Sequence, residues 1–476
     1  MARIAFIGAG SLVFAKTLIK DILAAPGLED SELVLMSRTP KKVGWVRDFV
    51  QRVIDNNRLP AKVRATTNRR EALEGADYVI AMIQVGGADA VKKDYEIPLK
   101  YGVDQCIADT LGPGGVMRAA RTIPVMLDIA RDMERYCPKA LMLNYVNPMA
   151  SICYALSKAT KIRFVGLCHG VQTTLGLIAG YLEVDKTDLD FLCAGVNHMG
   201  WFLKLEKDGQ DMYPLLRERI EWPEYYLPEK VRCETMRHFG YFMTESSGHL
   251  SEYLPYFRKN RQTLDTYCDQ PGFGGESGAA PKNYERVSRR FRSHNFLEVE
   301  PTDLGARGIE YGSYIIEAIE SGNLFVFNGN IRNDDYITNL PRGCCVEVPV
   351  AAGSGGLTPQ KVGELPPQLA ALCQTNVTVQ GLCADAAIRQ DLELVVHAMA
   401  LDPLTSAVLS LREIREMTIE MIEAERQYLP HFEGQRLEAK SAIRIPEGTV
   451  AVETPLDPAL AVVRHLRDLS NQSRDS

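Results

Sequence analysis

The chain has 476 residues, more than one small hydrophobic core can organise, so we expect two domains or one large bilobal unit. Its net charge of −7 provides no basic surface for nucleic acid and suits a protein that acts on a small molecule. It has no apolar run of the roughly 18 residues that span a bilayer, and its 11 scattered cysteines favour reduced thiols in the cytoplasm over a disulfide framework.

Strands and helices alternate along the chain as far as residue 167. The predicted strands are residues 3–7, 32–36, 61–66, 76–83, 140–145 and 164–167. The predicted helices between them include residues 12–22, 42–56 and 122–136. This alternation predicts an α/β fold with a parallel, doubly wound sheet, in which ligands bind at the carboxyl ends of the strands.

Beyond residue 200 the alternation is weaker. Helices are predicted over 302–321 and 385–400, strands over 324–328 and 345–350, and glycine-rich surface loops over 272–278 and 351–356. We therefore divide the chain into a Rossmann-like dinucleotide-binding domain (1–199), a domain for substrate, metal and oligomerisation (200–467) and a polar tail (468–476).

A glycine loop follows the first predicted strand and opens a helix. Its small residues allow backbone N–H groups to approach a pyrophosphate at the helix N-terminus, so Gly8, Gly10 and Ser11 are candidate cofactor contacts. The third glycine of the usual fingerprint is replaced by Val13. An ordinary strand-to-helix turn therefore remains the alternative interpretation.

The end of the second predicted strand is a further test of dinucleotide binding. An acidic residue there usually binds the ribose hydroxyls. The sequence instead has Ser37, Arg38 and Thr39, which can hold a 2′-phosphate, and Ser37 and Arg38 are candidate cofactor contacts. Arg38 can also stack on adenine or face solvent, so the choice between NAD and NADP is left open.

Cys168 directly follows the strand predicted over 164–167, and His198 lies further along the chain. A thiolate and an imidazole are good ligands for first-row transition metals. Two protein ligands are too few for a closed structural zinc site but leave positions open for substrate oxygens. Either residue alone is more often a structural core residue, whereas the two together favour a metal site.

Several other polar residues lie where ligands are expected. Asn144 and Asn147 come at the end of the strand predicted over 140–145, where amides can bind sugar hydroxyls or a nicotinamide, although Asn-Pro also favours a turn. Asp109 precedes a glycine-rich loop, and Glu245 and His249 flank Ser246-Ser247. Taken singly, Asp109, Glu245 and His249 are more often cap or turn residues.

Together the motifs identify a resemblance to a known family. The chain resembles glycoside hydrolase family 4, and is most similar to its melibiase-type α-galactosidases. The residues that carry the resemblance are 7–11, 107–115, 144–149, 165–169, 194–199, 241–247, 330–334 and 339–348. The resemblance implies a fold of the lactate and malate dehydrogenase-like superfamily with a C-terminal α+β domain, together with NAD⁺ and a divalent metal, typically Mn²⁺.

The family mechanism implies hydride removal from C3, abstraction of the C2 proton, loss of the glycosidic oxygen, water addition and return of the hydride. The implied roles are Cys168 and His198 for the metal and Asn147, Asp109 and Asn197 for the substrate, with His169 as acid and Glu245 as base, Asp109 or Tyr253 being alternate bases. Members specific for 6-phospho sugars have Asp where this chain has His169. The resemblance therefore implies an unphosphorylated sugar.

Alternatives to an α-galactoside are an α-glucoside, an α-glucuronide or a sulfoquinovoside, because arginines elsewhere can pair with a carboxylate or sulfonate. A net dehydrogenase of a polyol or hydroxy acid shares the same fold and loop, and a non-catalytic sensor is a third class. The metal pair favours the hydrolase over the dehydrogenase. The family further implies a homodimer or homotetramer, without nucleic-acid or membrane partners.

Overall fold

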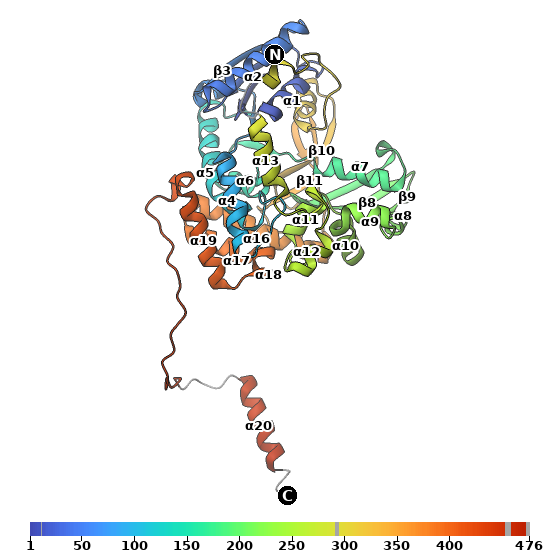
Figure 1. Ribbon diagram of the computed structural model, residues 1–476. Coiled ribbons are helices and arrows are strands. Elements are labelled where there is room, and N and C mark those ends of the chain that lie inside the picture. The colour runs from blue at the N-terminus through green and yellow to red at the C-terminus, as the bar shows by residue number, and fades with distance from the viewer. Residues whose placement is uncertain (11, 291–294, 453–457, 473–476) are drawn as a thin grey trace. The chain divides into compact units, whose positions relative to one another are not determined.

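The computed structural model describes residues 1–10, 12–290, 295–452 and 458–472, and these form two compact units, Met1–Glu438 and Ala439–Ser476. The second unit contains helix α20 (Pro458–Gln472), labelled in Figure 1. This helix includes residues 468–472 of the predicted polar tail, because apolar residues recur through it at helical spacing. No helix in the described ranges is long and apolar enough to cross a membrane.

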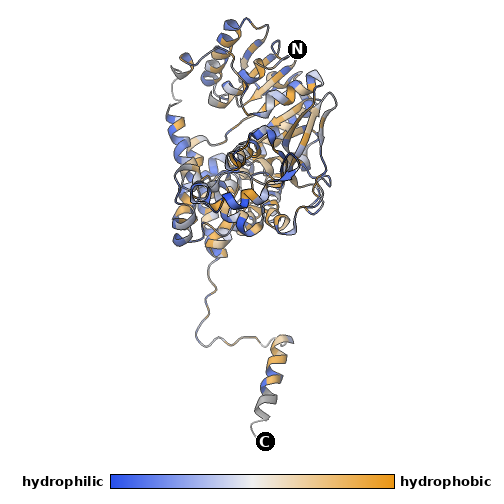
Figure 2. Ribbon diagram, turned by 90° about the vertical axis from the view of Figure 1, so that its right-hand side faces the viewer, coloured by the Kyte–Doolittle hydropathy of each residue, from blue (hydrophilic) through white to orange (hydrophobic). Residues whose placement is uncertain are grey.

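The N-terminal part of the sheet has the predicted parallel, doubly wound arrangement. Its strands run in the order β3-β2-β1-β4-β5-β6, which is the order of a Rossmann fold. Most of their side chains are buried, and Figure 2 shows this part of the sheet largely in the hydrophobic colour. The strands are β1 (Arg3–Ile7), β2 (Glu32–Met36), β3 (Lys62–Thr66), β4 (Tyr78–Ala81), β5 (Leu141–Asn144) and β6 (Arg163–Gly166).

Most of the connecting helices bury an apolar stripe, whereas α5 (Gly112–Tyr136) is buried on most sides. In α2 (Pro40–Asn56), for example, Val43, Val46 and Val50 lie three or four positions apart and are buried, and Pro40 occupies the first turn, where its missing N–H costs nothing. The other helices of this region are α1 (Leu12–Leu23), α3 (Arg69–Leu73), α4 (Gly87–Lys100), α5 (Gly112–Tyr136), α6 (Met149–Ala159) and α7 (Gly170–Leu182).

Helix α5 begins well before the predicted start at residue 122, and its first turn contains the glycine-rich segment that was expected to be a loop. A Cβ on Gly114 would lie 2.7 Å from the Ala108 carbonyl oxygen, and one on Gly115 would lie 2.4 Å from the Thr110 carbonyl carbon. The glycines are therefore needed for close packing of this helix against residues 108–110, and not for flexibility.

Antiparallel strands extend the same sheet beyond β6. The sheet continues in the order β10-β11-β7-β8-β9, and β12 pairs with β11. It is continuous across residue 200, where a domain boundary is predicted, and that boundary stays a prediction. These strands are β7 (Asp190–Val196), β8 (Met199–Lys207), β9 (Gln210–Asp211), β10 (Phe325–Arg332), β11 (Cys345–Gly353) and β12 (Gly356–Pro359).

Two helix predictions in the C-terminal half differ from the structure. The helix predicted from residue 302 begins only at Tyr311, because glycines at 305 and 308 interrupt the segment before it. The helix predicted over 385–400 is two helices, because Gln390 takes a left-handed conformation and Asp391 caps the second one. The longer helices here are α15 (Tyr311–Ser321), α16 (Pro367–Arg389), α17 (Leu392–Leu401) and α19 (Leu411–Glu425).

Shorter helices connect these parts of the fold. Residues of α8 and α10 pack against β8, α14 contacts α2, and α18 contacts α5, α11 and α17. Figure 1 labels α11 and α13 near the centre of the view. They are α8 (Tyr213–Arg219), α9 (Pro223–Tyr226), α10 (Lys230–Phe239), α11 (Ser247–Tyr253), α12 (Arg261–Tyr267), α13 (Ala279–Arg290), α14 (Asn295–Glu298) and α18 (Pro403–Val408).

One row of residues joins the parallel and antiparallel strands. Gly166 of β6 pairs with Asn330 of β10, Asn330 pairs with Glu347 of β11, and Glu347 pairs with Gly195 of β7. Residue 168 follows one end of this row, and residue 198 follows the other. The register of four strands therefore brings together the two segments that carry the predicted metal ligands.

The Glu347 carboxyl group within this row makes the stability of the fold depend on pH. It is 2% exposed and accepts a hydrogen bond from Asn330 Nδ2 at 3.2 Å. Burial and the nearby Glu245 charge raise its pKa from 4.5 to about 8. Between these values the folded state keeps a proton that the unfolded state has lost, so the free energy of unfolding must fall as pH rises.

We expect a Glu347→Gln variant to lose this dependence, because its amide has no proton to release. The wild-type chain should lose about 2–4 kcal/mol of unfolding free energy between about pH 5 and about pH 8 relative to the variant. Urea denaturation of both metal-free proteins measures the difference. Parallel curves for the two proteins across this range would contradict the prediction.

Candidate active site

The loop after β1 lies over the carboxyl end of β2. The backbone N–H groups of Gly8 and Ala9 both donate to the Met36 carbonyl oxygen at 2.9 Å. Gly8 has φ 101°, and a Cβ there would lie 2.7 Å from the Met82 carbonyl oxygen. Only glycine fits this backbone conformation and close approach. The loop backbone is therefore fixed against the carboxyl ends of β2 and β4, where an α/β sheet binds its ligands.

A cavity of about 460 Å³ borders this loop. Its volume is within the range of small-molecule and cofactor sites. Among the predicted cofactor contacts, Gly8, Gly10, Ser37 and Arg38 line it. Ser11, which is also predicted to contact the cofactor, lies outside the described residues.

Asn144 does not reach this cavity. Its side chain is fully buried, accepts from the Val146 N–H at 3.1 Å and donates to the Val146 carbonyl at 3.4 Å. An asparagine that bonds the backbone two residues on stabilises a local turn, so its amide is used structurally. Asn147 instead lines the cavity and donates from Nδ2 to Asp109 Oδ2 at 3.2 Å.

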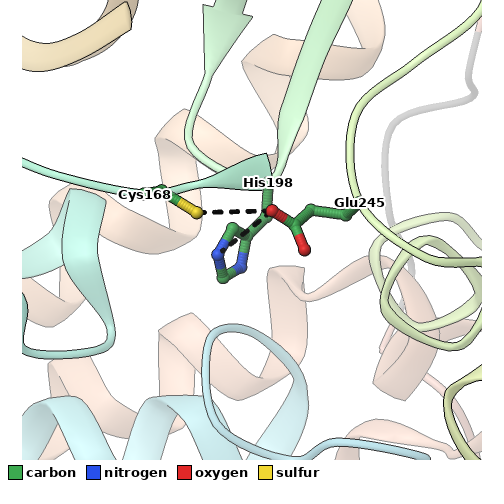
Figure 3. A group of neighbouring side chains, drawn as sticks. All are labelled: Cys168, His198 and Glu245. Carbon is green, nitrogen blue, oxygen red and sulfur yellow. Dashed lines mark hydrogen bonds and ion pairs between the residues drawn. The ribbon is translucent and has the colours of Figure 1, made fainter. Parts of the chain in front are cut away.

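Cys168, His198 and Glu245 converge from three separate segments, as Figure 3 shows. Cys168 Sγ lies 3.3 Å from Glu245 Oε1, and His198 Nε2 lies 3.7 Å from the same oxygen. The three donor atoms all lie within 4.8 Å of one another. The structure thus brings the predicted metal ligands together and adds the predicted base to the same cluster.

The backbone around this cluster is held in unusual conformations. His198, in the turn between β7 and β8, has φ 63°, and Glu245, just before α11, has φ 70°. Left-handed backbone at residues other than glycine is strained and is concentrated at functional sites. A Cβ on Gly170 would lie 1.9 Å from Glu245 Oε1. Gly170 therefore leaves the space in which the carboxylate approaches Cys168.

The donor set of this cluster fits a divalent metal ion. Burial opposes ionisation of Glu245, but the charges of His198 and His249 outweigh it and lower the pKa of Glu245 to about 2. A thiol, an imidazole and a carboxylate are ligand types that first-row divalent ions accept. Three protein donors leave coordination positions open for the oxygens of a substrate.

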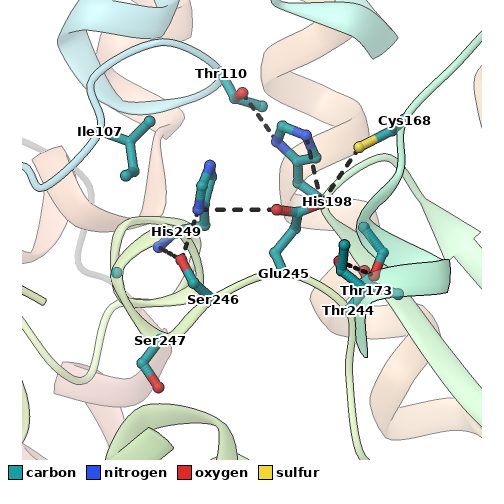
Figure 4. A network of polar contacts seen from close by, with 12 residues as sticks. Ile107, Thr110, Cys168, Thr173, His198, Thr244, Glu245, Ser246, Ser247 and His249 are labelled. Carbon is teal, nitrogen blue, oxygen red and sulfur yellow. Dashed lines mark hydrogen bonds and ion pairs between the residues drawn. The ribbon is translucent and has the colours of Figure 1, made fainter. Parts of the chain in front are cut away.

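Neighbouring hydroxyl groups orient the His198 ring, as Figure 4 shows for Thr110. His198 Nδ1 lies 3.0 Å from Thr110 Oγ1 and 3.3 Å from the Tyr253 hydroxyl oxygen. The Thr110 hydroxyl donates to Asp109 Oδ1 at 2.8 Å, so it is free to accept a hydrogen bond from Nδ1–H. This arrangement leaves Nε2 available as the ligand atom, as is usual for metal-binding histidines.

Asp109 connects the metal cluster to the dinucleotide cavity. Burial raises its pKa, but the charges of Arg118, His249 and His198 together with the Thr110 hydrogen bond outweigh that effect, and the pKa is lowered. Arg118 Nη1 lies 3.6 Å from Asp109 Oδ2. Arg118 also donates to Gln84 Oε1 at 2.6 Å and to the Asn147 carbonyl at 3.1 Å. Arg118, Gln84 and Asn147 all line the cavity. The two predicted sites are therefore one continuous polar region.

Asn197, the predicted substrate contact beside His198, is buried with a free amide. It is 2% exposed, and neither Nδ2 nor Oδ1 has a hydrogen-bond partner among the described residues. A buried amide without partners costs about 1–3 kcal/mol. A bound polar ligand would supply the missing hydrogen bonds.

His169 lies at the rim of the site. Its ring is 52% exposed, and Nδ1 lies 3.2 Å from Glu310 Oε1. The hydrogen bond that the imidazole donates to Glu310 raises its pKa, although burial opposes this. The ring is thus accessible to a ligand, and the Glu310 carboxylate stabilises its protonated form.

His249, which the sequence analysis discounts as a cap or turn residue, also lies in the site. Its ring centroid lies 5.3 Å from that of His198. Nδ1 lies 2.8 Å from Ser246 Oγ and 3.8 Å from Glu245 Oε2. Burial lowers the pKa of this imidazole. The spacing of Glu245 and His249 by four residues was the available signal, because it places both on one side of a helix start.

Glu252 is a residue that the sequence analysis missed. It is fully buried on α11, and its carboxylate accepts from the Ile107 and Ala108 N–H groups and from Gln105 Nε2. Ala108 has φ 59° and directly precedes Asp109. Glu252 therefore fixes the strained loop that carries Asp109. A lone glutamate in a helical segment gives no sequence signal of such a role.

We expect Glu252→Gln to lower kcat by about ten- to a hundredfold, because its amide cannot accept all three hydrogen bonds and the Asp109 loop shifts. Steady-state rates and thermal unfolding of the variant measure the effect. Glu416→Gln, an exposed change on α19, is the control and should keep full activity. A variant that is less stable but fully active would show that Glu252 is structural only.

Residues 3–184 match the model of the family 4 glycosyl hydrolases, and residues 193–405 match that of their C-terminal domain. The chain is 37% identical over 481 residues to an α-galactosidase of Rhizobium meliloti, covering 98% of this chain and 96% of that protein. It is 39% identical over 437 residues to an α-galactosidase of Bacillus subtilis, covering 91% of this chain and 100% of that protein.

A similar solved structure is a 6-phospho-α-glucosidase from gut microorganisms in complex with NAD and Mn²⁺. It is 21% identical, covers 90% of this chain and 99% of that chain, and superposes with a TM-score of 0.74. At this level of identity the likeness concerns the fold.

Proposed function

Because the chain belongs to family 4 of the glycosyl hydrolases, we propose that it hydrolyses α-galactosides with a nicotinamide dinucleotide and a divalent metal ion, Mn²⁺. One observation carries this proposal. The Cys168–His198–Glu245 cluster is joined through Thr110 and Asp109 to a cavity at the glycine loop. This arrangement supports a metal site and a dinucleotide site on either side of one substrate position.

Each group has a defined place in this proposal. Cys168 and His198 hold the metal, and Gly8, Gly10 and Ser37 border the dinucleotide. When bound, the dinucleotide supplies reversible oxidation at the sugar C3, and the metal ion acidifies the proton on C2. This combination explains why a hydrolase has both a dinucleotide loop and a metal cluster with open positions.

The remaining polar residues bind the sugar and move protons. The free amide of Asn197 and the side chains of Asp109 and Asn147 contact sugar hydroxyls. Glu245 removes the C2 proton from its position beside the metal ligands. His169, exposed at the rim and paired with Glu310, protonates the leaving glycosidic oxygen.

His249 is a second candidate for the base, favoured by one observation. Its ring faces His198 at 5.3 Å between centroids, and Nδ1 is engaged by Ser246. This leaves Nε2 to accept a proton from a substrate bound at the cluster. Asp109 is less suited as the base, because its carboxylate is paired with Arg118 and Asn147.

We propose that the natural substrates are α-galactosides, since two relatives more than a third identical over nearly their whole length are α-galactosidases. A panel of nitrophenyl α-glycosides, assayed with NAD⁺ or NADP⁺, Mn²⁺ and a reductant, tests this choice. The galactoside should be cleaved fastest among galactoside, glucoside, glucuronide and sulfoquinovoside. Cleavage of another member in preference to it would reassign the sugar.

The same assay separates hydrolysis from net oxidation. A hydrolase turns over many times per dinucleotide, whereas a dehydrogenase of a polyol or hydroxy acid accumulates the reduced dinucleotide in proportion to substrate. We expect substoichiometric dinucleotide to support complete hydrolysis. A steady rise of absorbance from the reduced dinucleotide, equal to substrate consumed, would contradict the proposal.

We further propose that the protein acts in the cytoplasm as a homodimer or homotetramer. All 11 cysteines are free thiols, ten of them buried, which suits a reducing compartment. Light scattering coupled to size-exclusion chromatography measures the oligomeric state, and a monomer at assay concentration would contradict this proposal.

A further inference from the structure

The end of β2 lies beside the glycine loop. Gly8 and Ala9 both bond to Met36, the last residue of β2. A Cβ on Gly10 would lie 2.7 Å from Ser37 Oγ and 3.6 Å from Lys42 Cβ. A dinucleotide that crosses the glycine loop must therefore place its adenine ribose against the segment from Ser37 to Lys42.

This segment is cationic and has no acid. The residues that line the cavity include Arg38, Lys42 and Arg118 but no Asp or Glu within the described ranges. Arg118 is paired with Asp109. Arg38 and Lys42 are exposed and have no ion-pair partner in the described part of the chain. Two positive charges at the cavity are thus left without an anion.

The start of α2 adds to this positive potential. Thr39 is its N-cap residue and makes no side-chain cap hydrogen bond. Because Pro40 has no N–H and the Val43 N–H bonds the Thr39 carbonyl, the N–H groups of Lys41 and Lys42 remain for another acceptor. A helix N-terminus carries partial positive charge that favours an anion. Lys41 is not among the residues that line the cavity, and its ammonium lies 5.3 Å from the centre of the Trp45 ring.

We propose that the dinucleotide site prefers NADP⁺ to NAD⁺, with Arg38, Lys42 and the start of α2 binding the 2′-phosphate. A site for the unphosphorylated ribose uses a carboxylate to accept from its hydroxyls. Ser37 provides only one hydroxyl at that position. A phosphate dianion instead matches the side chains of Arg38 and Lys42 and the uncapped N–H groups at the start of α2. The inference depends on the proposed function only in assuming that a dinucleotide binds the glycine loop.

Direct binding tests this proposal without a glycoside, so it is independent of which sugar is cleaved. Isothermal titration of the full chain at fixed ionic strength should give about tenfold or tighter binding of NADP⁺ than of NAD⁺. Arg38→Ser and Lys42→Ser should each weaken NADP⁺ binding by about tenfold and leave NAD⁺ binding nearly unchanged. Lys41→Ser, the neighbouring lysine outside the cavity, is the matched control and should change neither.

Ser37→Asp is the complementary variant, because it restores an acid that repels a phosphate and accepts from a ribose hydroxyl. We expect it to reverse the preference toward NAD⁺. Parent protein that binds NAD⁺ as tightly as NADP⁺ would overturn the proposal. Equal losses for both dinucleotides in Arg38→Ser and Lys42→Ser would also overturn it, because they would show that these cations do not contact the 2′-phosphate.

Discussion

Replacing Cys168 by serine is expected to lower kcat for an α-galactoside by about a thousandfold, because a catalytic metal ion supplies several kcal/mol of transition-state stabilisation. The Cys168 thiol belongs to the three-donor cluster with His198 and Glu245. A serine hydroxyl fills nearly the same space but is a poor ligand for a transition metal. Mn²⁺ should therefore bind the variant about tenfold or more weakly, as measured by electron paramagnetic resonance of the free ion.

The fold should survive this change, because serine fills nearly the same space as cysteine. Circular dichroism and thermal unfolding measure whether it does. Cys193→Ser is the control, because Cys193 is a buried free thiol on β7 and lies outside the cluster. It should keep its Mn²⁺ affinity. Full activity of Cys168→Ser without added metal would refute the assignment of Cys168 as a ligand.

A Glu245→Gln variant is expected to lower kcat by about a hundred- to ten-thousandfold even at saturating Mn²⁺. The amide keeps the shape of the side chain but cannot remove a proton. Glu245 Oε1 lies 3.7 Å from His198 Nε2, so a substrate bound to the metal would present its C2 proton close to this carboxylate. The rate of C2 proton exchange with solvent should fall together with kcat.

Glu245→Gln also distinguishes a role of Glu245 as a metal ligand from a role as the base. If high Mn²⁺ restores activity, the carboxylate serves as a metal ligand and not as the base. His249→Gln is the paired variant, because the His249 ring lies beside His198 and is the second candidate. Retention of C2 exchange in His249→Gln and its loss in Glu245→Gln would support Glu245, and the reverse pattern would assign the base to His249.

The sequence predicted the metal pair because Cys168 follows a strand end and because His198 belongs to a motif of the family. Both lie where the register of β6, β10, β11 and β7 joins the two halves of the sheet. That register involves strands far apart in the sequence, so the closeness of Glu245 to both ligands could not be read from spacing. Only the folded chain places these three donors together.

Other residues show why local patterns were insufficient. Asn144 has the chemistry of a cofactor contact, but its amide is used by Val146 in a turn. The glycines at the start of α5 have the composition of a loop, but close packing against residues 108–110 requires them within a helix. Glu252 acts on the backbone of a distant loop, and no periodicity or motif indicates such a contact.

The parallel half of the fold was more predictable. Short apolar runs alternate with amphipathic helices, and the period of each pattern follows directly from strand and helix geometry. The antiparallel extension was only partly predicted, because β7 and β8 have no comparable helix between them and their pairing depends on the turn at His198.

Removal of the C2 proton during catalysis is tested by hydrolysing nitrophenyl α-galactoside in heavy water with dinucleotide and Mn²⁺. The released galactose is expected to carry deuterium at C2, because the Glu245 region removes the C2 proton before the glycosidic bond breaks and a solvent deuteron replaces it. Mass spectrometry and proton magnetic resonance of the product measure this. Galactose that is released without deuterium at C2 would rule out proton removal at this carbon.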